Sequence, residues 1–485
     1  MATSRKTYRK FALDVITVSS ANILVALSPI ILLPVLTRNL GVDGYGIFVQ
    51  FNVTIALATP IVMFAITGAM IRFLAGEKDT QVIREGFYSV TLFVFGTGLI
   101  VSALLVVFSK FLAATFFGAD QRIVVMLALI IPITCLNFVF LMFFRTFGDV
   151  RRYTVFVVVQ GCAELGLIWY TVQSGHGIHG ATICMLAVRG TLFLIMLYMI
   201  TSKIGFRVPI FSQLNKYLRF SVPYVPANIA GWVINSSDRY LIGIFLGAFF
   251  VGVYNPSYSL GNIIVLFITP LEFVLFPTVV KLYHEGKQEE VRFLLHYALK
   301  FFLFLAIPAA FGISLLSKSL LISLSTTEIA SRGYLITPFV ACSALIYGTA
   351  VIFNEVIALS KKTRIAGIAW VSASAINLGL NLLFIPWLGI VGAAITTLVA
   401  FTLGAAIVVR SSFKYLTFSI PWLAICKSLV ASAVMSVFVW AMHPVGPTHI
   451  VISIAGGAFI YGVALVLLKG FTRQELGFFR EFLRL

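Results

Sequence analysis

The side chains best suited to chemistry are ionisable groups that lie inside long apolar runs. Glu164 and Arg189 stand near the middles of the runs 154–173 and 180–201. A charge at the centre of a bilayer costs roughly 3 kcal/mol or more, so such groups pair with one another or line a hydrated cavity. The planar fork of arginine binds a carboxylate or a phosphate through two oxygens. We therefore expect Glu164 and Arg189 to meet, either as a structural ion pair or as a cavity cation held by its carboxylate until an anion arrives.

Further arginines stand at the ends of apolar runs, where they either anchor the chain at the membrane surface or guide an anion. They are Arg38, Arg72, Arg145 and Arg219. Two acids, Glu272 and Glu355, lie inside the runs 251–280 and 333–357. Each is either a buried structural acid or a group that couples the protein to H⁺ or Na⁺.

The run 220–245 carries both a charged pair and two prolines. Asp238 and Arg239 lie near its end, and we interpret them as a gate or an interhelix pair ahead of a substrate contact. Pro223 and Pro226 lie near its start. Proline removes a backbone donor and kinks a helix, so this helix is a candidate for the element that bends when the protein changes conformation.

The elements that must position these residues are membrane helices. Apolar residues make up 60% of the 485 residues and charged residues only 11%, against about 25% charged in a soluble domain. The net charge of +18 comes from Lys and Arg in short gaps between apolar runs. This pattern excludes a nucleic-acid binder, which carries its basic residues on a solvated domain, and favours contact with anionic lipids. The five cysteines have no CxxC spacing, and we expect no metal and no cofactor apart from a coupling cation.

Fourteen runs have about the length of a membrane-spanning helix, which needs roughly 20 mostly apolar residues. These runs predict an all-α polytopic protein. About 27 of the 35 Lys and Arg fall in one set of alternating connections and five in the other. By the positive-inside rule, this bias predicts that both termini lie in the cytoplasm. We expect the chain in the cytoplasmic (inner) membrane of a prokaryote. The predicted spans are 14–36, 46–73, 86–108, 123–144, 154–173, 180–201, 220–245, 251–280, 297–317, 333–357, 365–385, 389–409, 421–441 and 449–468.

An internal repeat divides the chain. The triplet Ala-Asn-Ile at 21–23 recurs at 227–229, Leu-Gly at 40–41 recurs at 246–247, and Gly46 aligns with Gly252 at the same offset. The offset covers six spans, an even number, so we expect two like-oriented six-helix bundles at 1–205 and 206–412 around a central cavity. Residues 413–485 add two helices and an amphipathic cytoplasmic tail.

Asn22 and Asn228 occupy equivalent places in the repeat. Two amides facing one cavity would suit sugar hydroxyls, whereas the alternative for each is an interhelical hydrogen bond.

Three segments resemble the polysaccharide transporter family. The segment 36–48, LTRNLGVDGYGIF, is similar to that family's junction between the first two helices. The segments RFSVPYVP at 219–226 and SDRY at 237–240 resemble its seventh helix. The wider superfamily also contains multidrug and cation antiporters. Its members have twelve helices in two similar halves, followed in some by two further helices, and this arrangement resembles the predicted organisation.

The resemblance implies a Wzx-type flippase, which moves an isoprenoid-pyrophosphate-linked oligosaccharide to the outer leaflet during synthesis of surface polysaccharide. The arginines and asparagines above would then contact the glycolipid head group, and a polysaccharide polymerase and chain-length proteins become candidate partners of a monomeric transporter. The alternatives are a cation-coupled multidrug or metabolite antiporter and a membrane polymerase or glycosyltransferase. The last is disfavoured because no predicted outer loop is long enough for a catalytic domain and no Walker, HExxH or GxSxG motif is present, so we do not expect an enzyme.

Overall fold

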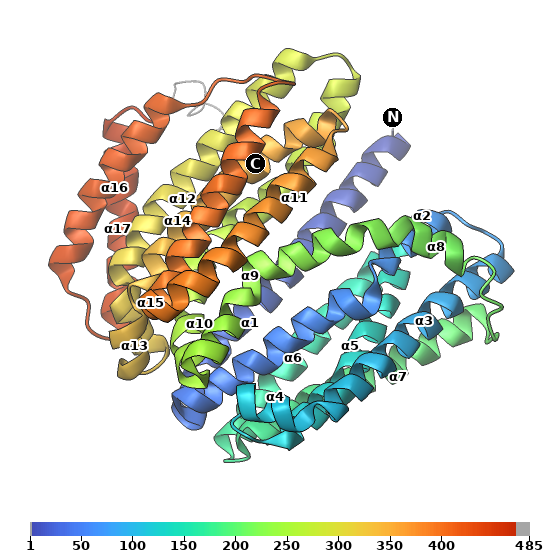
Figure 1. The fold of residues 1–485 in the computed structure, drawn as a ribbon. Coiled ribbons are helices and arrows are strands. Elements are labelled where there is room, and N and C mark those ends of the chain that lie inside the picture. The colour runs from blue at the N-terminus through green and yellow to red at the C-terminus, as the bar shows by residue number, and fades with distance from the viewer. Residues whose placement is uncertain (1, 472–485) are drawn as a thin grey trace. The chain divides into compact units, whose positions relative to one another are not determined.

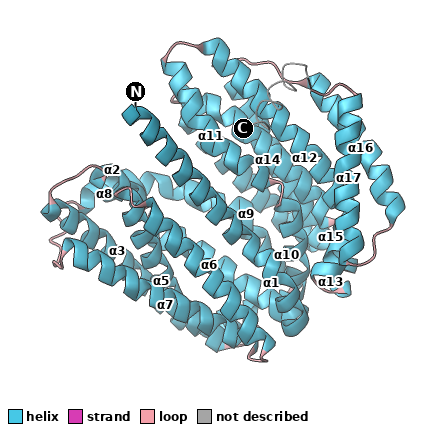
Figure 2. Ribbon diagram, turned by 180° about the vertical axis from the view of Figure 1, so that it is seen from behind, coloured by secondary structure: helices cyan, strands magenta, loops and turns pink. Residues whose placement is uncertain are grey.

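The protein is a multi-pass, helical membrane protein. The computed structural model describes the backbone of residues 2–471, and the side chains of 25–471 apart from residues 26, 273 and 274. Within this range all regular secondary structure is helical, and the connecting loops are short (Figure 1; Figure 2). Eleven helices of the described part are long and apolar enough to cross a membrane. The chain forms two compact units, Met1–Asn255 and Pro256–Leu485.

Unit 1 is built around the helix α5 (Gln121–Thr146), which is buried along most of its length and packs against α1, α3, α6 and α7. Aspartates start several of its helices because their carboxylates accept the unpaired N–H groups of the first turn, as Asp79 does from Gln81 N at 2.8 Å. The other elements of the unit are α1 (Ala2–Met63), α2 (Ile66–Leu74), α3 (Thr80–Val107), α4 (Ser109–Phe116), α6 (Val150–Gln173), α7 (Gly177–Ile204), α8 (Leu214–Ser221), the 3₁₀ turn η1 (Val222–Tyr224), α9 (Val225–Leu246) and the first half of α10 (Ala248–Asn262).

Unit 2 centres on α12 and α14, which pack against each other and share one apolar core with α11 and α15. Its last two long helices, α16 and α17, pack against each other and against α12. The helices of this unit are the second half of α10, α11 (Val265–His284), α12 (Gln288–Leu324), α13 (Thr327–Gly333), α14 (Ile336–Leu359), α15 (Thr363–Ser412), α16 (Trp422–Met442) and α17 (Pro447–Leu467).

Three predicted spans are divided in the structure. The run 46–73 breaks at Phe64 and Ala65, whose φ angles of 47° and 55° lie in the left-handed region. The run 251–280 breaks between α10 and α11, and the run 220–245 contains the end of α8, η1 and α9. The prediction of single helices was wrong here because hydropathy reports the length of an apolar run and not the backbone angles within it.

Glycines that the repeat relates to one another have similar backbone conformations. Gly41 interrupts α1 with φ 71° and ψ 176°, and Gly247 separates α9 from α10 with φ 88° and ψ 173°. Residues with a β-carbon rarely adopt positive φ, so each glycine permits a change of helix direction at its position.

Candidate functional site

An ion pair in unit 1 joins the two mid-span charges. Arg189 on α7 donates from Nε to Glu164 Oε1 on α6 at 2.8 Å and from Nη2 to Oε2 at 3.2 Å. Its Nη1 donates to Thr134 Oγ1 on α5 at 2.9 Å. Gln160 donates a further bond to Glu164, at 3.0 Å. The expected pairing is therefore present, and it ties together three neighbouring helices.

Arg189 is only 8% exposed, and Asn137 donates to its backbone carbonyl at 2.9 Å. This bidentate, nearly buried geometry is that of a structural cross-link, because Nε, Nη1 and Nη2 all have partners within the protein. Its role as a cavity cation stays a prediction, since the guanidinium would have to exchange Glu164 for an anionic substrate.

A second cluster forms where α1, α9 and the first half of α10 meet. A β-carbon built on Gly46 would overlap the carbonyl of Ala248, and one built on Gly252 would overlap the carbonyl of Val42. The repeat offset of 206 relates Gly46 to Gly252 and Val42 to Ala248, so the contact is reciprocal, as it is across a two-fold axis. Only glycine at both positions lets the two backbones approach so closely.

Two charged residues of α9 are buried and form hydrogen bonds with α10. Asp238 and Arg239 are 2% and 5% exposed, and Arg239 Nη1 lies 2.9 Å from Asp238 Oδ1. Tyr254 donates its hydroxyl to Asp238 Oδ2 at 2.6 Å, and Arg239 Nε donates to Asn255 Oδ1 at 3.3 Å. The amide of Asn255 in turn donates to Tyr45 Oη at 2.9 Å. The predicted pair is thus bonded to α10, and through Asn255 it reaches α1.

Two more hydrogen bonds join α1 to α9. Gln50 donates from Nε2 to the carbonyl of Arg239 at 2.8 Å, and the hydroxyls of Thr54 and Tyr240 lie 2.5 Å apart. Gly243 leaves room for the Gln50 side chain, because a β-carbon there would overlap Nε2. We name the reciprocal glycine contact and these polar bonds the α1–α9–α10 crossing.

The arginines predicted at helix ends are exposed. Arg38 lies on α1 just before Gly41, and Arg145 ends α5. Arg72 lies over the Phe220 ring at 4.7 Å, and Arg219 is near the end of α8. Among the described contacts, none joins these four arginines to the Glu164–Arg189 pair.

The remaining candidates are scattered. Asn228 is exposed on α9, whereas the side chain of Asn22 lies outside the described residues. Pro223 falls in η1, and Pro226 lies in the first turn of α9, where proline costs no hydrogen bond.

In unit 2, the two predicted acids differ in burial. Glu355 on α14 is 5% exposed, and its Oε2 has no hydrogen-bond partner among the described residues. Glu272 on α11 is exposed but lies within electrostatic reach of Glu355.

Sequence reasoning missed a carboxylate that holds the linker between α7 and α8. Glu85, 9% exposed, accepts the backbone N–H groups of Ile210 at 3.0 Å and of Ser212 at 3.3 Å. The neighbouring Tyr88 donates to the carbonyl of Gly205 at 2.9 Å, and Arg84 donates to that of Ile204. The partners lie more than 115 residues away, so no local pattern marks Glu85.

A buried amide and hydroxyl cluster within α15 was also missed. Asn381 donates to Asn377 Oδ1 at 3.1 Å and accepts from the hydroxyl of Thr396. These three side chains are at most 1% exposed. Asn377 and Asn381 precede Gly389 and Thr396 follows it, so only the change of direction of α15 at this glycine shows that they meet.

Two curated relatives from Haloferax volcanii are named as probable flippases. The chain is 28% identical over 262 residues to the "Probable flippase AglR", covering 51% of this chain and 54% of that protein. It is 23% identical over 446 residues to the "Probable low-salt glycan biosynthesis flippase Agl15", covering 89% of this chain and 90% of that one. The match thus spans about half the length of the first relative and most of the second.

Solved structures show the same fold. The lipid II flippase MurJ in an inward closed conformation superposes with a TM-score of 0.75 at 16% identity, covering 94% of this chain and 99% of that one. An inward-facing multidrug transporter of the MATE family superposes with a TM-score of 0.60 at 15% identity, covering 82% of this chain and 94% of that one.

The family described as "Polysaccharide biosynthesis protein" matches residues 11–283, more than half of the chain, including all three segments noted in the sequence. The region also contains the Glu164–Arg189 pair and the α1–α9–α10 crossing. The chain therefore belongs to the polysaccharide biosynthesis protein family of membrane transporters.

Proposed function

We propose that this protein is a flippase that carries an isoprenoid-pyrophosphate-linked oligosaccharide across the cytoplasmic membrane by alternating access. Membership of the polysaccharide biosynthesis family carries the proposal, and the similarity to Agl15 over most of both chains supports it. The head group cannot cross about 30 Å of hydrocarbon unaided, whereas the lipid remains in the membrane. The protein therefore needs to supply only a hydrated path and a means of closing it at alternate ends.

The proposed topology has fourteen spans, with both termini in the cytoplasm. The charge bias of the connecting segments supports this orientation. The breaks at Gly41 and Gly389 support it too, because each divides a long helix of the structure into two spans. Two like-oriented bundles at 1–205 and 206–412 then account for the similar conformations of repeat-related glycines.

The α1–α9–α10 crossing is the proposed outer gate. In the proposed topology, Gly41 and Gly247 lie at the outer ends of the first and seventh spans, so the crossing closes that side. The reciprocal contact joins elements of both repeats, and it can open only when α1 separates from α9 and α10 together.

Coupling is proposed to involve Glu272 and Glu355. A buried carboxylate with an unpartnered oxygen is costly unless it binds a proton or a cation, so protonation or Na⁺ binding would alter the packing of α11 against α14. The exposed arginines Arg38, Arg145 and Arg219 are the proposed phosphate contacts at the two mouths of the path.

Depletion of the protein in its host tests this function. We expect lipid-linked oligosaccharide to accumulate on the inner leaflet, where only an inside-acting glycosidase reaches it. Normal surface glycan in depleted cells, with no accumulation, would contradict the proposal.

A further inference from the structure

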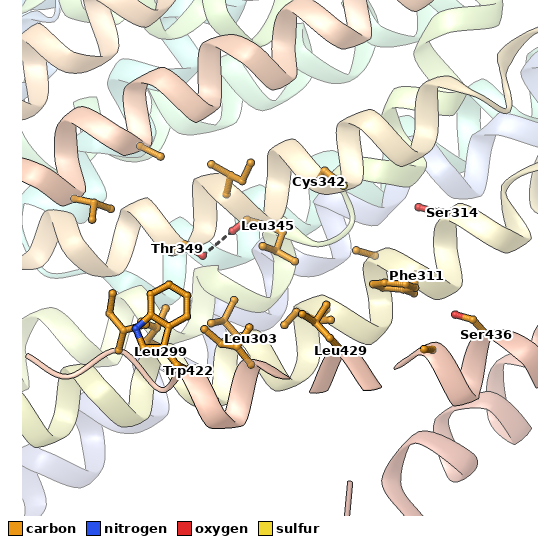
Figure 3. Close-up of a pocket in the computed structure, with 18 of the residues that line it drawn as sticks. Leu299, Leu303, Phe311, Ser314, Cys342, Leu345, Thr349, Trp422, Leu429 and Ser436 are labelled. Atoms are coloured by element: carbon orange, nitrogen blue, oxygen red, sulfur yellow. Dashed lines mark hydrogen bonds between the residues drawn. The ribbon is translucent and has the colours of Figure 1, made fainter. Parts of the chain in front are cut away.

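A long apolar groove runs beside α12 in unit 2. It encloses about 880 Å³ between α12, α14, α15 and α16. On α12 it is lined by Leu299, Leu303, Ile307 and Ala310, whose spacing of three or four residues places them on one face of the helix. Figure 3 shows Leu299 and Trp422 at one end of the groove and Ser314 and Ser436 at the other. The groove therefore follows the helix axis.

The groove is open to the surroundings along its length. Phe311, Leu429 and Trp422, which line it, are 37%, 43% and 66% exposed. From Leu299 to Ser314 the helix rises about 22 Å, compared with a hydrocarbon core of about 30 Å. A hydrocarbon chain fits along this length without crossing the whole membrane.

The end of the groove at Leu299 adjoins a polar pocket. This second pocket has a volume of about 810 Å³ and is lined by residues of α12 and of the segment before α16. On both, these residues directly precede those of the groove: His296 lies one turn before Leu299, and Ser419 precedes Ile420. His296 Nδ1 lies 2.6 Å from the carbonyl of Ser419, which fastens α12 to the segment before α16. A polar pocket that continues into an apolar groove matches a lipid, with its head in the first and its chain in the second.

The charges of the pocket identify the kind of head group. Arg292 Nη1 lies 2.7 Å from Glu289 Oε1, whereas Arg292 Nε is buried and has no hydrogen-bond partner among the described residues. Lys300, one turn beyond His296, is buried among Tyr297 and Phe304 and lines neither pocket. Arg292 and Glu289 together carry no net charge, so this pair suits a head group that is also neutral overall, with its phosphodiester beside the guanidinium and its ammonium beside the carboxylate. A pyrophosphate has no positive group of its own and does not match such a pair.

We propose that the α12 groove is a binding site for a membrane phospholipid, separate from the transport path. The phosphodiester lies beside Arg292 and His296, and one hydrocarbon chain occupies the groove past Leu303 and Ala433. Trp422 lies at the boundary between head and chain, where tryptophan is favoured in membrane proteins.

Photo-cross-linking of the full-length protein tests the site. The probe is phosphatidylethanolamine with a diazirine near the end of one chain, present in trace in vesicles of phosphatidylglycerol. Cross-links mapped by mass spectrometry are expected in the α12 and α16 peptides that contain Leu303 and Leu429. Ala433→Phe, which fills the groove, and Arg292→Gln, which removes the phosphate contact, should each lower this labelling at least fivefold.

The matched control is Ala441→Phe, at an exposed position two turns further along α16 that does not line the groove. It should label as the unsubstituted protein does. Equal labelling in Ala433→Phe and Ala441→Phe would overturn the placement of the chain. Labelling that undecaprenyl pyrophosphate displaces, and that added unlabelled phosphatidylethanolamine does not, would overturn the assignment to a phospholipid.

Discussion

Alanine at Gly46 or Gly252 is expected to open the α1–α9–α10 crossing. A β-carbon on Gly46 would lie 2.8 Å from the carbonyl carbon of Ala248, against an ordinary contact of 3.4 Å or more, so the backbones must separate by about 0.6 Å at least. The opposing atoms belong to the backbone, so no side-chain rotation relieves the overlap. Overpacking of this kind costs about 1–3 kcal/mol. If the open state lacks the contact, the equilibrium shifts toward it by roughly 5- to 150-fold.

Thiol accessibility measures this opening. Ser237→Cys places a thiol beside the buried Asp238, where the native hydroxyl is buried and has no partner among the described residues. In a background without the five native cysteines, labelling of this thiol by a membrane-impermeant reagent is expected to accelerate in Gly46→Ala and Gly252→Ala. Gly231→Ala on α9 is the control, because a β-carbon there meets nothing within 4 Å.

The reasoning is refuted if both crossing variants fold and label at the rate of the Gly231→Ala control. The glycine contact would then not keep the crossing closed.

Three further perturbations follow from the structure. Arg189→Ala should destabilise the protein by about 3–5 kcal/mol, because it leaves Glu164 buried without its partner. Replacing both residues by apolar ones should restore most of this loss. Equal thermal unfolding temperatures of the single and double variants would contradict the prediction. Glu85→Ala removes the acceptor for two backbone N–H groups of the segment after α7, so limited proteolysis of this segment should become faster. An unchanged rate would show that Glu85 does not hold the segment in place. Alanine at both Pro223 and Pro226 should slow transport if the start of α9 bends during the cycle, and unchanged transport would count against that role.

The sequence predicted the helices well where an apolar run coincides with one helix. The predicted spans 123–144 and 154–173 match α5 and α6 to within a few residues, because the thickness of the hydrocarbon core sets their length. The break at Phe64 and Ala65 could not be predicted in this way, since neither residue is a type that favours positive φ.

Contacts between neighbouring helices were predictable, and distant ones were not. The Glu164–Arg189 pair follows from the packing of consecutive helices. Asp238 and Arg239 likewise bond to residues of the next helix, α10. The sequence repeat identified Gly46 and Gly252 as equivalent, but their direct contact depends on how α1 crosses α10, which no spacing reveals.

Reconstituted vesicles offer the most direct test of the proposed function. Purified protein would be placed in liposomes that carry a fluorescent isoprenoid-pyrophosphate-linked oligosaccharide in both leaflets, and an impermeant glycosidase would be added outside. The account predicts that the enzyme eventually releases nearly all of the glycan, because the protein brings the inner pool outward. Release of only the outer half, as in vesicles without protein, would contradict it.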